Sequence, residues 1–176
     1  MAGTSIFRQT GVIIAFSLFL FSPVLADNQE EDRARASEIE EMYDGYRRSF
    51  PAVRDISAGE AMKRFGEGTV IFVDEREAEE QAVSMLPGAI KAEEFLKDPA
   101  RYEDKLVVGY CTISYRSGVL AQELQKMGIT MVNLKGGILA WVHAGGKVYR
   151  DGIPVNEVHV YRRKWNLAPS SYRAVW

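Results

Sequence analysis

Two unbroken runs of apolar, β-prone residues constrain the fold of this chain most strongly. Residues 69–73 (TVIFV) and 106–110 (LVVGY) lack the alternation of apolar and polar side chains that a half-exposed strand shows. Unbroken strands of this kind suit a parallel sheet that is covered on both faces. A third, shorter run follows at 131–134, and helical patterns separate the three runs. This order predicts an α/β fold with a doubly wound parallel sheet flanked by helices.

The segments between these runs carry helix signals. Ser57 and Glu60 have the spacing of a capping box, so a helix is expected to begin there and to end at Gly66. An apolar face that includes Leu120 and Leu124 predicts a helix over residues 117–127. The smaller expected elements are an acidic helix at 77–83, a strand at 89–92, a helical turn at 93–96 and a helix at 138–143.

The length of 176 residues and the apolar fraction of 47% fit one globular domain with extensions at its ends. The formal net charge of -2 gives no general attraction to nucleic acid or to an anionic membrane. We therefore expect no nucleic-acid partner and no stable membrane insertion apart from an uncleaved N-terminal segment. The predicted divisions are a signal peptide (1–26), a charged extension (27–50), the main domain (51–150) and an aromatic, basic extension (151–176).

The first 26 residues have the layout of a secretory signal peptide. An apolar run at 12–21 is broken by Ser22 and Pro23, and residues 24–26 end in the small residue Ala26 before charged chain begins. The apolar run is too short for a comfortable membrane span. We expect a cleaved signal and an exported protein, either periplasmic or secreted. The alternatives are a membrane anchor that is not cleaved and a buried helix.

The two remaining extensions differ in character. Residues 27–50 are dense in charge and predict a solvated helix, interpreted as a spacer after the signal. The last residues, His159 to Trp176, are rich in aromatic side chains and arginine. We expect this tail to pack across the domain.

The single cysteine, Cys111, follows directly after the strand at 106–110. In open α/β sheets, ligands bind at the carboxyl ends of the strands. The helix after the loop directs free N–H groups and the positive end of its dipole toward Cys111, which favours the thiolate. Arg116 adds a permanent cation whose planar fork suits an oxyanion. Cys111 is therefore a candidate nucleophile, with an inert buried thiol and a disulfide to another chain as alternatives.

Other chemistries find less support in the sequence. A Cys–His hydrolase would need His143 or His159 as the partner of Cys111. The apolar sequence around each histidine favours a structural role. Two isolated histidines and one cysteine do not make a metal site at ligand spacing. No phosphate-binding glycine fingerprint is present, and no cofactor is expected.

Four segments in order resemble the rhodanese-like family, over a stretch from about Ser57 to Val148. They are Val73-Asp-Glu-Arg76, Leu86-Pro-Gly-Ala-Ile90, the loop Cys111 to Arg116, and Leu134-Lys-Gly-Gly137 with Trp141 and Gly145. The loop has four residues between cysteine and arginine. Rhodanese-like loops that handle sulfur have this length, whereas related phosphatases and arsenate reductases have one residue more.

The resemblance implies a sulfurtransferase. Cys111 would attack the outer sulfur of a small anionic donor such as thiosulfate, become a persulfide, and lose the sulfur to a thiol or to cyanide. Arg116 would bind the donor or the leaving sulfite. The loop residues implied in substrate binding are Thr112, Ile113, Ser114 and Tyr115, and the supporting residues are Asp74, Arg76 and Ser117. Asp74 and Arg76 are interpreted as a structural ion pair.

One departure from the family pattern leaves a second function open. Many loops of the family carry glycine where this chain has Ser114. Glycine permits positive φ and lets backbone N–H groups converge, whereas serine there is strained or reshapes the loop. The alternative is a binding or thiol-redox module with little turnover.

Overall fold

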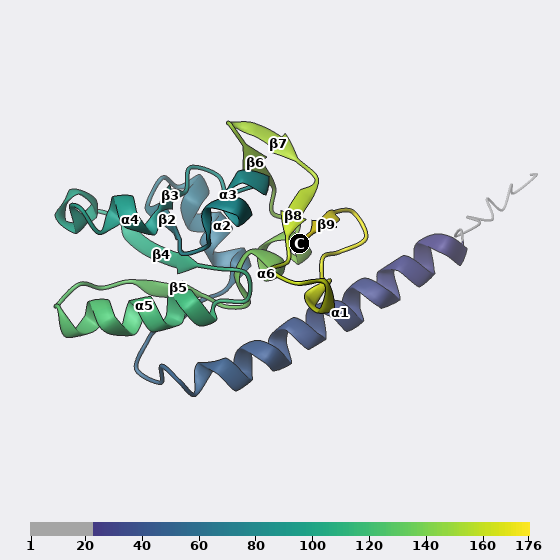
Figure 1. Cartoon of the computed structure of the whole chain (residues 1–176), viewed down its shortest axis with the longest axis horizontal. Coiled ribbons are helices and arrows are strands. Elements are labelled where there is room, and N and C mark those ends of the chain that lie inside the picture. The colour runs from purple at the N-terminus through teal and green to yellow at the C-terminus, as the bar shows by residue number, and fades with distance from the viewer. Residues whose placement is uncertain (1–22) are drawn as a thin grey trace, which may run out of the picture.

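The computed structural model describes residues 23–176 and confirms the predicted fold class. A five-stranded, fully parallel sheet is flanked by helices (Figure 1). The strand order is β1-β5-β4-β2-β3. The sheet strands are β1 (Asp55–Ile56), β2 (Val70–Asp74), β3 (Ile90–Lys91), β4 (Leu106–Tyr110) and β5 (Val132–Leu134). The helices are α1 (Pro23–Arg47), α2 (Ala58–Gly66), α3 (Ala78–Val83), α4 (Ala92–Phe95), α5 (Tyr115–Lys126) and α6 (Gly137–His143), with 3-10 turns η1 (Pro99–Tyr102) and η2 (Arg163–Trp165).

The central strand β4 delivers Cys111 to the middle of the sheet's carboxyl edge. It pairs with β2 along its whole length, from Val70 opposite Leu106 to Asp74 opposite Tyr110, and with β5 on its other side. Because every strand of the sheet is parallel, the ends of β2, β4 and β5 meet at one edge. The loops that follow these strands are therefore neighbours.

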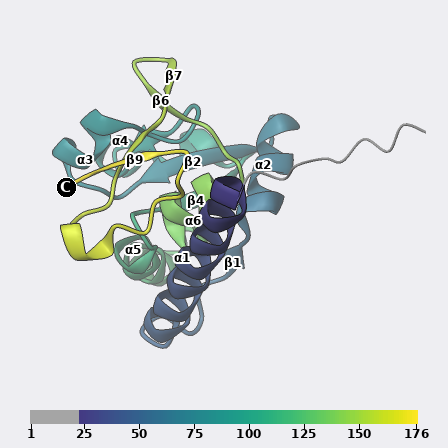
Figure 2. The same cartoon turned by 90° about the vertical axis from the view of Figure 1, so that its right-hand side faces the viewer.

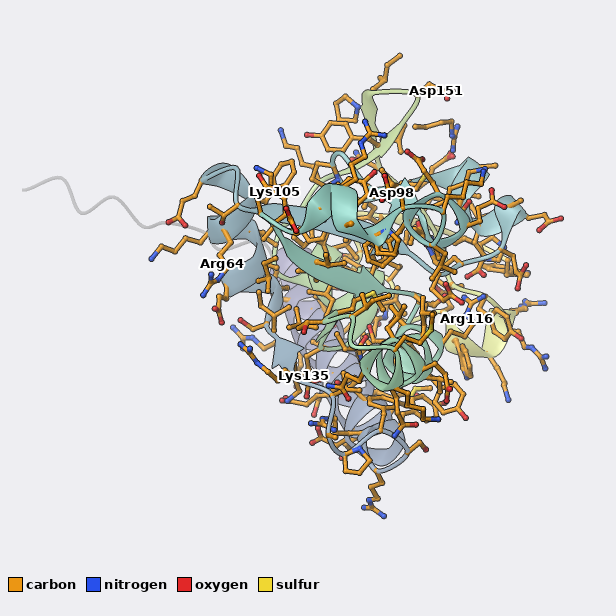
Figure 3. The ribbon with its side chains drawn as sticks, turned by 90° about the vertical axis from the view of Figure 1, so that its left-hand side faces the viewer. Arg64, Asp98, Lys105, Arg116, Lys135 and Asp151 are labelled. Carbon is orange, nitrogen blue, oxygen red and sulfur yellow. The ribbon has the colours of Figure 1, made fainter. Side chains whose placement is uncertain are left out.

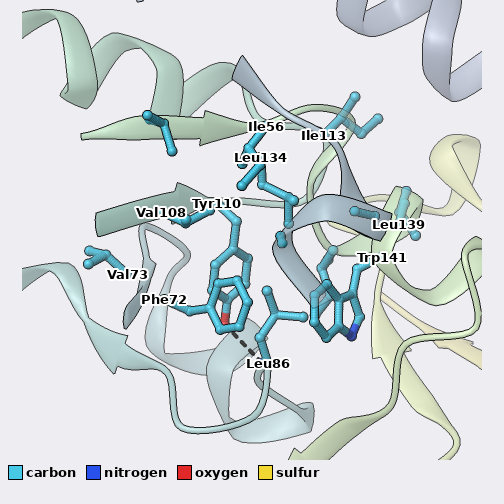
Figure 4. Close-up of a cluster of buried hydrophobic side chains, with 14 of the residues drawn as sticks. Ile56, Phe72, Val73, Leu86, Val108, Tyr110, Ile113, Leu134, Leu139 and Trp141 are labelled. Carbon is cyan, nitrogen blue, oxygen red and sulfur yellow. Dashed lines mark hydrogen bonds between the residues drawn. The ribbon is translucent and has the colours of Figure 1, made fainter. Parts of the chain in front are cut away.

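The core lies between the sheet and the helices that flank it. Phe72, Val108 and Leu134 are fully buried, and they come from the three longest sheet strands (Figure 4). Trp141 of α6 meets Phe72 edge to face, with ring centroids 5.2 Å apart. This aromatic contact packs α6 against β2 of the sheet.

The local signals located the elements well, with small differences at their ends. Helix α5 begins at Tyr115, two residues before the predicted start, so Arg116 lies in its first turn. Strand β1 was not predicted. At the start of α2, Ser57 accepts the N–H of Glu60 as expected, but the Glu60 carboxylate pairs with Arg64, and only half of the capping box forms.

The charged N-terminal segment is a helix, as predicted, but it is packed against the domain. Ile39 and Tyr43 of α1 are 2% and 1% exposed, and the Tyr43 hydroxyl bonds to Asp55. Lys135, at the end of β5, pairs with Glu40 at 2.6 Å. The interpretation of this segment as a spacer is therefore wrong: its few apolar side chains lie on one helical face, and that face is buried.

The predicted signal peptide lies almost entirely outside the described residues and stays a prediction. Within residues 23–176, no helix combines the length and the apolar character needed to cross a membrane.

The chain after α6 packs over the domain, as expected for the tail. A hairpin of β6 (Val148–Arg150) and β7 (Ile153–Val155) leads to a parallel pair of β8 (Glu157–His159) and β9 (Arg173–Val175). Val158, Val160 and Leu167 are buried. The intervening segment, with η2, lies beside α5 (Figure 2).

The packing of α1 makes a first prediction. Ile39→Ala should lower the free energy of unfolding by about 2–4 kcal/mol, because it leaves a cavity in the core. Glu38→Ala, on the exposed side of the same helix, should change it by less than about 0.5 kcal/mol. Urea unfolding of both variants is the measurement. Equal effects of the two substitutions would mean that α1 does not contribute to the core.

Candidate active site

Cys111 lies where β4 ends and the loop to α5 begins. Its side chain is buried, with the residue 3% exposed, and its Sγ accepts the backbone N–H of Ser114 at 3.1 Å. Helix α5 begins at Tyr115, directly after Ser114, and has 12 residues, so the positive end of its dipole faces the loop. The sulfur therefore lies beside one backbone N–H donor and near the positive end of a helix dipole.

The turn that brings this N–H to the sulfur needs an unusual backbone at Ser114. Its φ is 69°, in the left-handed region, which costs a residue with a side chain about 1–2 kcal/mol. The serine hydroxyl donates to the carbonyl of Leu134, and the Ser114 carbonyl accepts from Asn133 Nδ2 at 2.9 Å. These bonds to β5 hold the strained conformation, which is the strain predicted for a serine at this position.

Arg116 points back across the loop to a carboxylate that the sequence did not identify. Its Nη1 lies 2.7 Å from Glu80 Oε2 and its Nη2 lies 2.9 Å from Glu80 Oε1, a two-pronged ion pair. The Thr112 hydroxyl donates to the same carboxylate at 2.8 Å, and Glu80 is only 2% exposed. The fork of the predicted anion clamp is thus occupied by Glu80.

Both members of this pair keep their charge. Burial alone would lower the pKa of the Arg116 guanidinium, but the bond to Glu80 and the charges of Cys111 and Glu80 outweigh it, so the pKa is raised. Burial alone would raise the pKa of Glu80, but the bonds from Arg116 and from the Glu77 N–H hold it below its usual range. The pair is therefore ionised at neutral pH.

A small pocket of about 120 Å³ opens beside Cys111. Its lining joins the loop to aromatic side chains from distant parts of the chain, and the lining residues are Tyr46, Cys111, Thr112, Ile113, Tyr115, Arg116, Tyr161 and Trp165. The Arg116 guanidinium lies over the Tyr161 ring, 5.4 Å from its centroid, next to the C-terminal segment drawn in yellow (Figure 3). A larger cleft of about 410 Å³, between α3 and α4, does not include Cys111.

The outer wall of the pocket is held in place by its own contacts. The Tyr161 and Trp165 rings pack at a tilt of 30° with centroids 5.1 Å apart, and the Tyr46 and Tyr115 rings pack at a tilt of 58° with centroids 5.2 Å apart. Tyr161 has a φ of 68°, and its N–H donates to His159 Nδ1 at 3.0 Å. Burial lowers the pKa of His159, so this nitrogen is a neutral acceptor. His143 instead contacts the carbonyl of Leu167 through Nε2, at 2.8 Å.

Comparison with known proteins identifies the fold. The rhodanese-like domain family matches residues 57–144, which is half of the 176-residue chain. This chain belongs to the rhodanese-like domain family. A comparison with curated proteins found no match.

Several solved structures are similar to this chain. A thiosulfate sulfurtransferase from Pseudomonas aeruginosa has a TM-score of 0.54 and 19% identity, over 65% of this chain and 23% of that one. A rhodanese-related protein from Thermoplasma volcanium has a TM-score of 0.48 and 24% identity, over 55% and 97% of the two chains. A protein from Rhodopseudomonas palustris, described as a possible tyrosine phosphatase, has a TM-score of 0.49 and 27% identity, over 63% and 93%.

In this rhodanese-like domain the start of α6, at Gly137, lies against the loop that holds Cys111. The first N–H groups of α6 reach the loop carbonyls, from Ile138 to Cys111 at 3.0 Å and from Leu139 to Thr112 at 3.3 Å. A Cβ on Gly137 would lie 2.4 Å from the carbonyl oxygen of Cys111. Gly137, with a φ of 61°, is therefore required for this close approach.

The predicted supporting residues lie behind or beside the pocket and not in it. Asp74 and Arg76 form a buried ion pair at 2.7 Å, and Arg76 also donates to the Ser84 carbonyl. Tyr110 donates to Asp74 at 2.5 Å and accepts the Leu86 N–H, the dashed contact in Figure 4. This network fastens the turn after α3 to the ends of β2 and β4, in keeping with a structural ion pair.

Ser117 has a similar place on the other side of the loop. Its hydroxyl donates to Asn133 Oδ1 at 2.8 Å, and both residues are fully buried. Of the loop residues predicted to bind substrate, Ser114 is also buried away from the pocket, whereas Thr112, Ile113, Tyr115 and Arg116 line it. The residues that sequence reasoning missed are Glu80, Tyr46, Tyr161 and Trp165. For the last two, the only signal was the density of aromatic residues in the tail.

The strained turn yields a second prediction. Ser114→Ala should lower the free energy of unfolding by about 1–3 kcal/mol, because it removes the bond to Leu134 and keeps the strain. Ser114→Gly loses the same bond but relieves about 1 kcal/mol of strain, so its loss should be smaller. Urea unfolding measures both. If glycine were as costly as alanine, the strain at Ser114 would be negligible.

Proposed function

We propose that this rhodanese-like protein is a sulfurtransferase that carries sulfane sulfur as a persulfide on Cys111. The observation that supports this most is the position of its Sγ, 3.1 Å from the Ser114 N–H, at the start of α5 and at the base of a pocket. In the proposed mechanism the Cys111 thiolate accepts the Ser114 N–H, and a small donor reaches the sulfur from the pocket that Cys111 lines.

The proposed first step takes sulfur from a small anionic donor of the thiosulfate type. The Cys111 thiolate attacks the outer sulfur of the donor, and a new sulfur–sulfur bond forms. The bond between the two donor sulfurs breaks, and sulfite leaves with its electron pair. Loop N–H groups and the start of α5 stabilise the negative persulfide that remains.

The proposed second step returns the enzyme to its thiolate form. A thiol or cyanide attacks the outer sulfur of the persulfide, takes it, and leaves the electron pair of the broken bond on Cys111. With cyanide the product is thiocyanate. Neither step needs a cofactor.

The test is the intact mass of the purified protein after incubation with thiosulfate, beside a Cys111→Ser control. We expect a gain of one sulfur atom in the wild type, no gain in the control, and loss of the gain on adding cyanide. A wild type that stays unmodified by every sulfane-sulfur donor, although folded and with a free thiol, would overturn the proposal. A binding or thiol-redox module with little turnover would then be the better description of the site.

We also propose that the protein works outside the cytoplasm, after export by the segment 1–26. If so, the mass of the protein recovered from an expressing bacterium should correspond to a chain that begins at Asp27. A chain that retains residues 1–26 and fractionates with membranes would instead support the uncleaved anchor.

A further inference from the structure

The charge at the pocket is almost balanced before any donor arrives. Among the described residues that line it, Arg116 alone carries a positive charge, and Glu80 holds both of its terminal nitrogens at 2.7 and 2.9 Å. With Cys111 as thiolate, these three groups sum to one negative charge. A dianion such as thiosulfate meets repulsion there, and it loses more hydration than a monoanion on entering.

The walls of the pocket offer apolar contact in place of charge. Besides Ile113, they are the rings of Tyr46, Tyr115, Tyr161 and Trp165. Three of these four rings lie outside residues 57–144, the stretch that matches the family. They are contributed by α1 and by the C-terminal segment. Aromatic walls stabilise an alkyl or aryl body and give little to a small, strongly hydrated dianion.

Cations near the pocket lie at its rim. Arg162 Cζ lies over the Tyr161 ring, 5.1 Å from its centroid, and Lys164 Nζ lies over the Trp165 ring, 5.9 Å from its centroid. Both residues are exposed and absent from the lining. Charges placed in this way act through solvent and are weakened by salt. They do not replace the paired charge of Arg116 inside the pocket.

We propose that the preferred donor is an organic sulfane-sulfur compound with a single negative charge and an apolar body, and that Glu80, Tyr161 and Trp165 set this preference. The inference rests on the proposed sulfurtransferase function. For a thiosulfonate, the Cys111 thiolate bonds to the terminal sulfur, the sulfur–sulfur bond of the donor breaks, and the sulfinate leaves with the electron pair. Charge and atoms balance as they do with thiosulfate.

Three donors separate the effect of the charge of the donor from the effect of its apolar body. Thiosulfate is the dianion, methanethiosulfonate is a monoanion with a small body, and benzenethiosulfonate is a monoanion with an aromatic body. Thiocyanate formed from cyanide gives kcat/KM for each donor. Sulfinate and sulfite differ as leaving groups, so kcat/KM values for different donors are not compared directly. The informative quantity is the ratio of kcat/KM for two donors, and how this ratio changes from the wild type to each variant.

The aromatic wall is tested at Trp165. Trp165→Leu should lower kcat/KM about tenfold for benzenethiosulfonate and by less than about twofold for thiosulfate, because one aromatic contact is lost. Trp165→Phe should restore most of the loss. Trp176→Leu is the matched control, since Trp176 belongs to the same segment but does not line the pocket, and it should alter neither donor. Tyr161→Leu should act in the same direction as Trp165→Leu.

The charge balance is tested at Glu80. Glu80→Gln keeps the shape of the side chain and frees the charge of Arg116, so kcat/KM for thiosulfate should rise about tenfold relative to either thiosulfonate. Equal loss with all three donors would overturn the role of Glu80 in selectivity and leave it as a positioning residue. Equal effects of Trp165→Leu and Tyr161→Leu on all donors would overturn the aromatic preference. Failure of the sulfurtransferase function itself looks different, since no donor would then load Cys111 in the wild type.

Discussion

The hydrogen bond from the Ser114 hydroxyl to the Leu134 carbonyl fixes the loop on which the rest of the site depends. It ties the loop after β4 to the end of β5 and holds a left-handed turn in a residue that is not glycine. The N–H groups of α6 occupy the carbonyls of Cys111 and Thr112 from behind. The loop is thus held by bonds to α6, and its Ser114 N–H donates to the Cys111 sulfur. Geometry that would otherwise require glycine is thus stabilised by neighbours in the sheet.

Two buried carboxylates, Asp74 and Glu80, lie near the carboxyl edge of the sheet, and they bind different partners. Asp74 pairs with Arg76 and Tyr110, away from the pocket, and so joins the turn after α3 to the strands. Glu80 pairs with Arg116 and Thr112 beside Cys111 and therefore sets the charge that a ligand meets. A buried pair of this kind loses much if one partner is removed, because the other charge is left without compensation. Both carboxylates come from one short stretch, residues 74–80, so this stretch contacts both the strands of the sheet edge and the loop that holds Cys111.

Local sequence patterns were sufficient where structure is decided locally. The unbroken run at 69–73 became β2, the run at 106–110 became β4, and the position of Cys111 after β4 followed directly. Patterns were insufficient where contacts join distant residues. Glu80 stands in an acidic helix whose neighbours look the same, and only its contact with Arg116, 36 positions later, distinguishes it. The charged segment was misread because two apolar residues, Ile39 and Tyr43, were too few to signal a packed face among so many charges. The two-residue strand β1 is defined only by its pairing with β5.

The two extensions of the chain contact each other, and each also contributes to the pocket. Asp32 of α1 accepts from Ser170, and Arg35 donates to the Ala168 carbonyl at 3.1 Å, so α1 fastens the C-terminal segment. The same helix supplies Tyr46 to the pocket, and the C-terminal segment supplies Tyr161 and Trp165. The stretch that matches the family thus supplies Cys111 and its loop, and the extensions supply three of the four aromatic rings of the pocket.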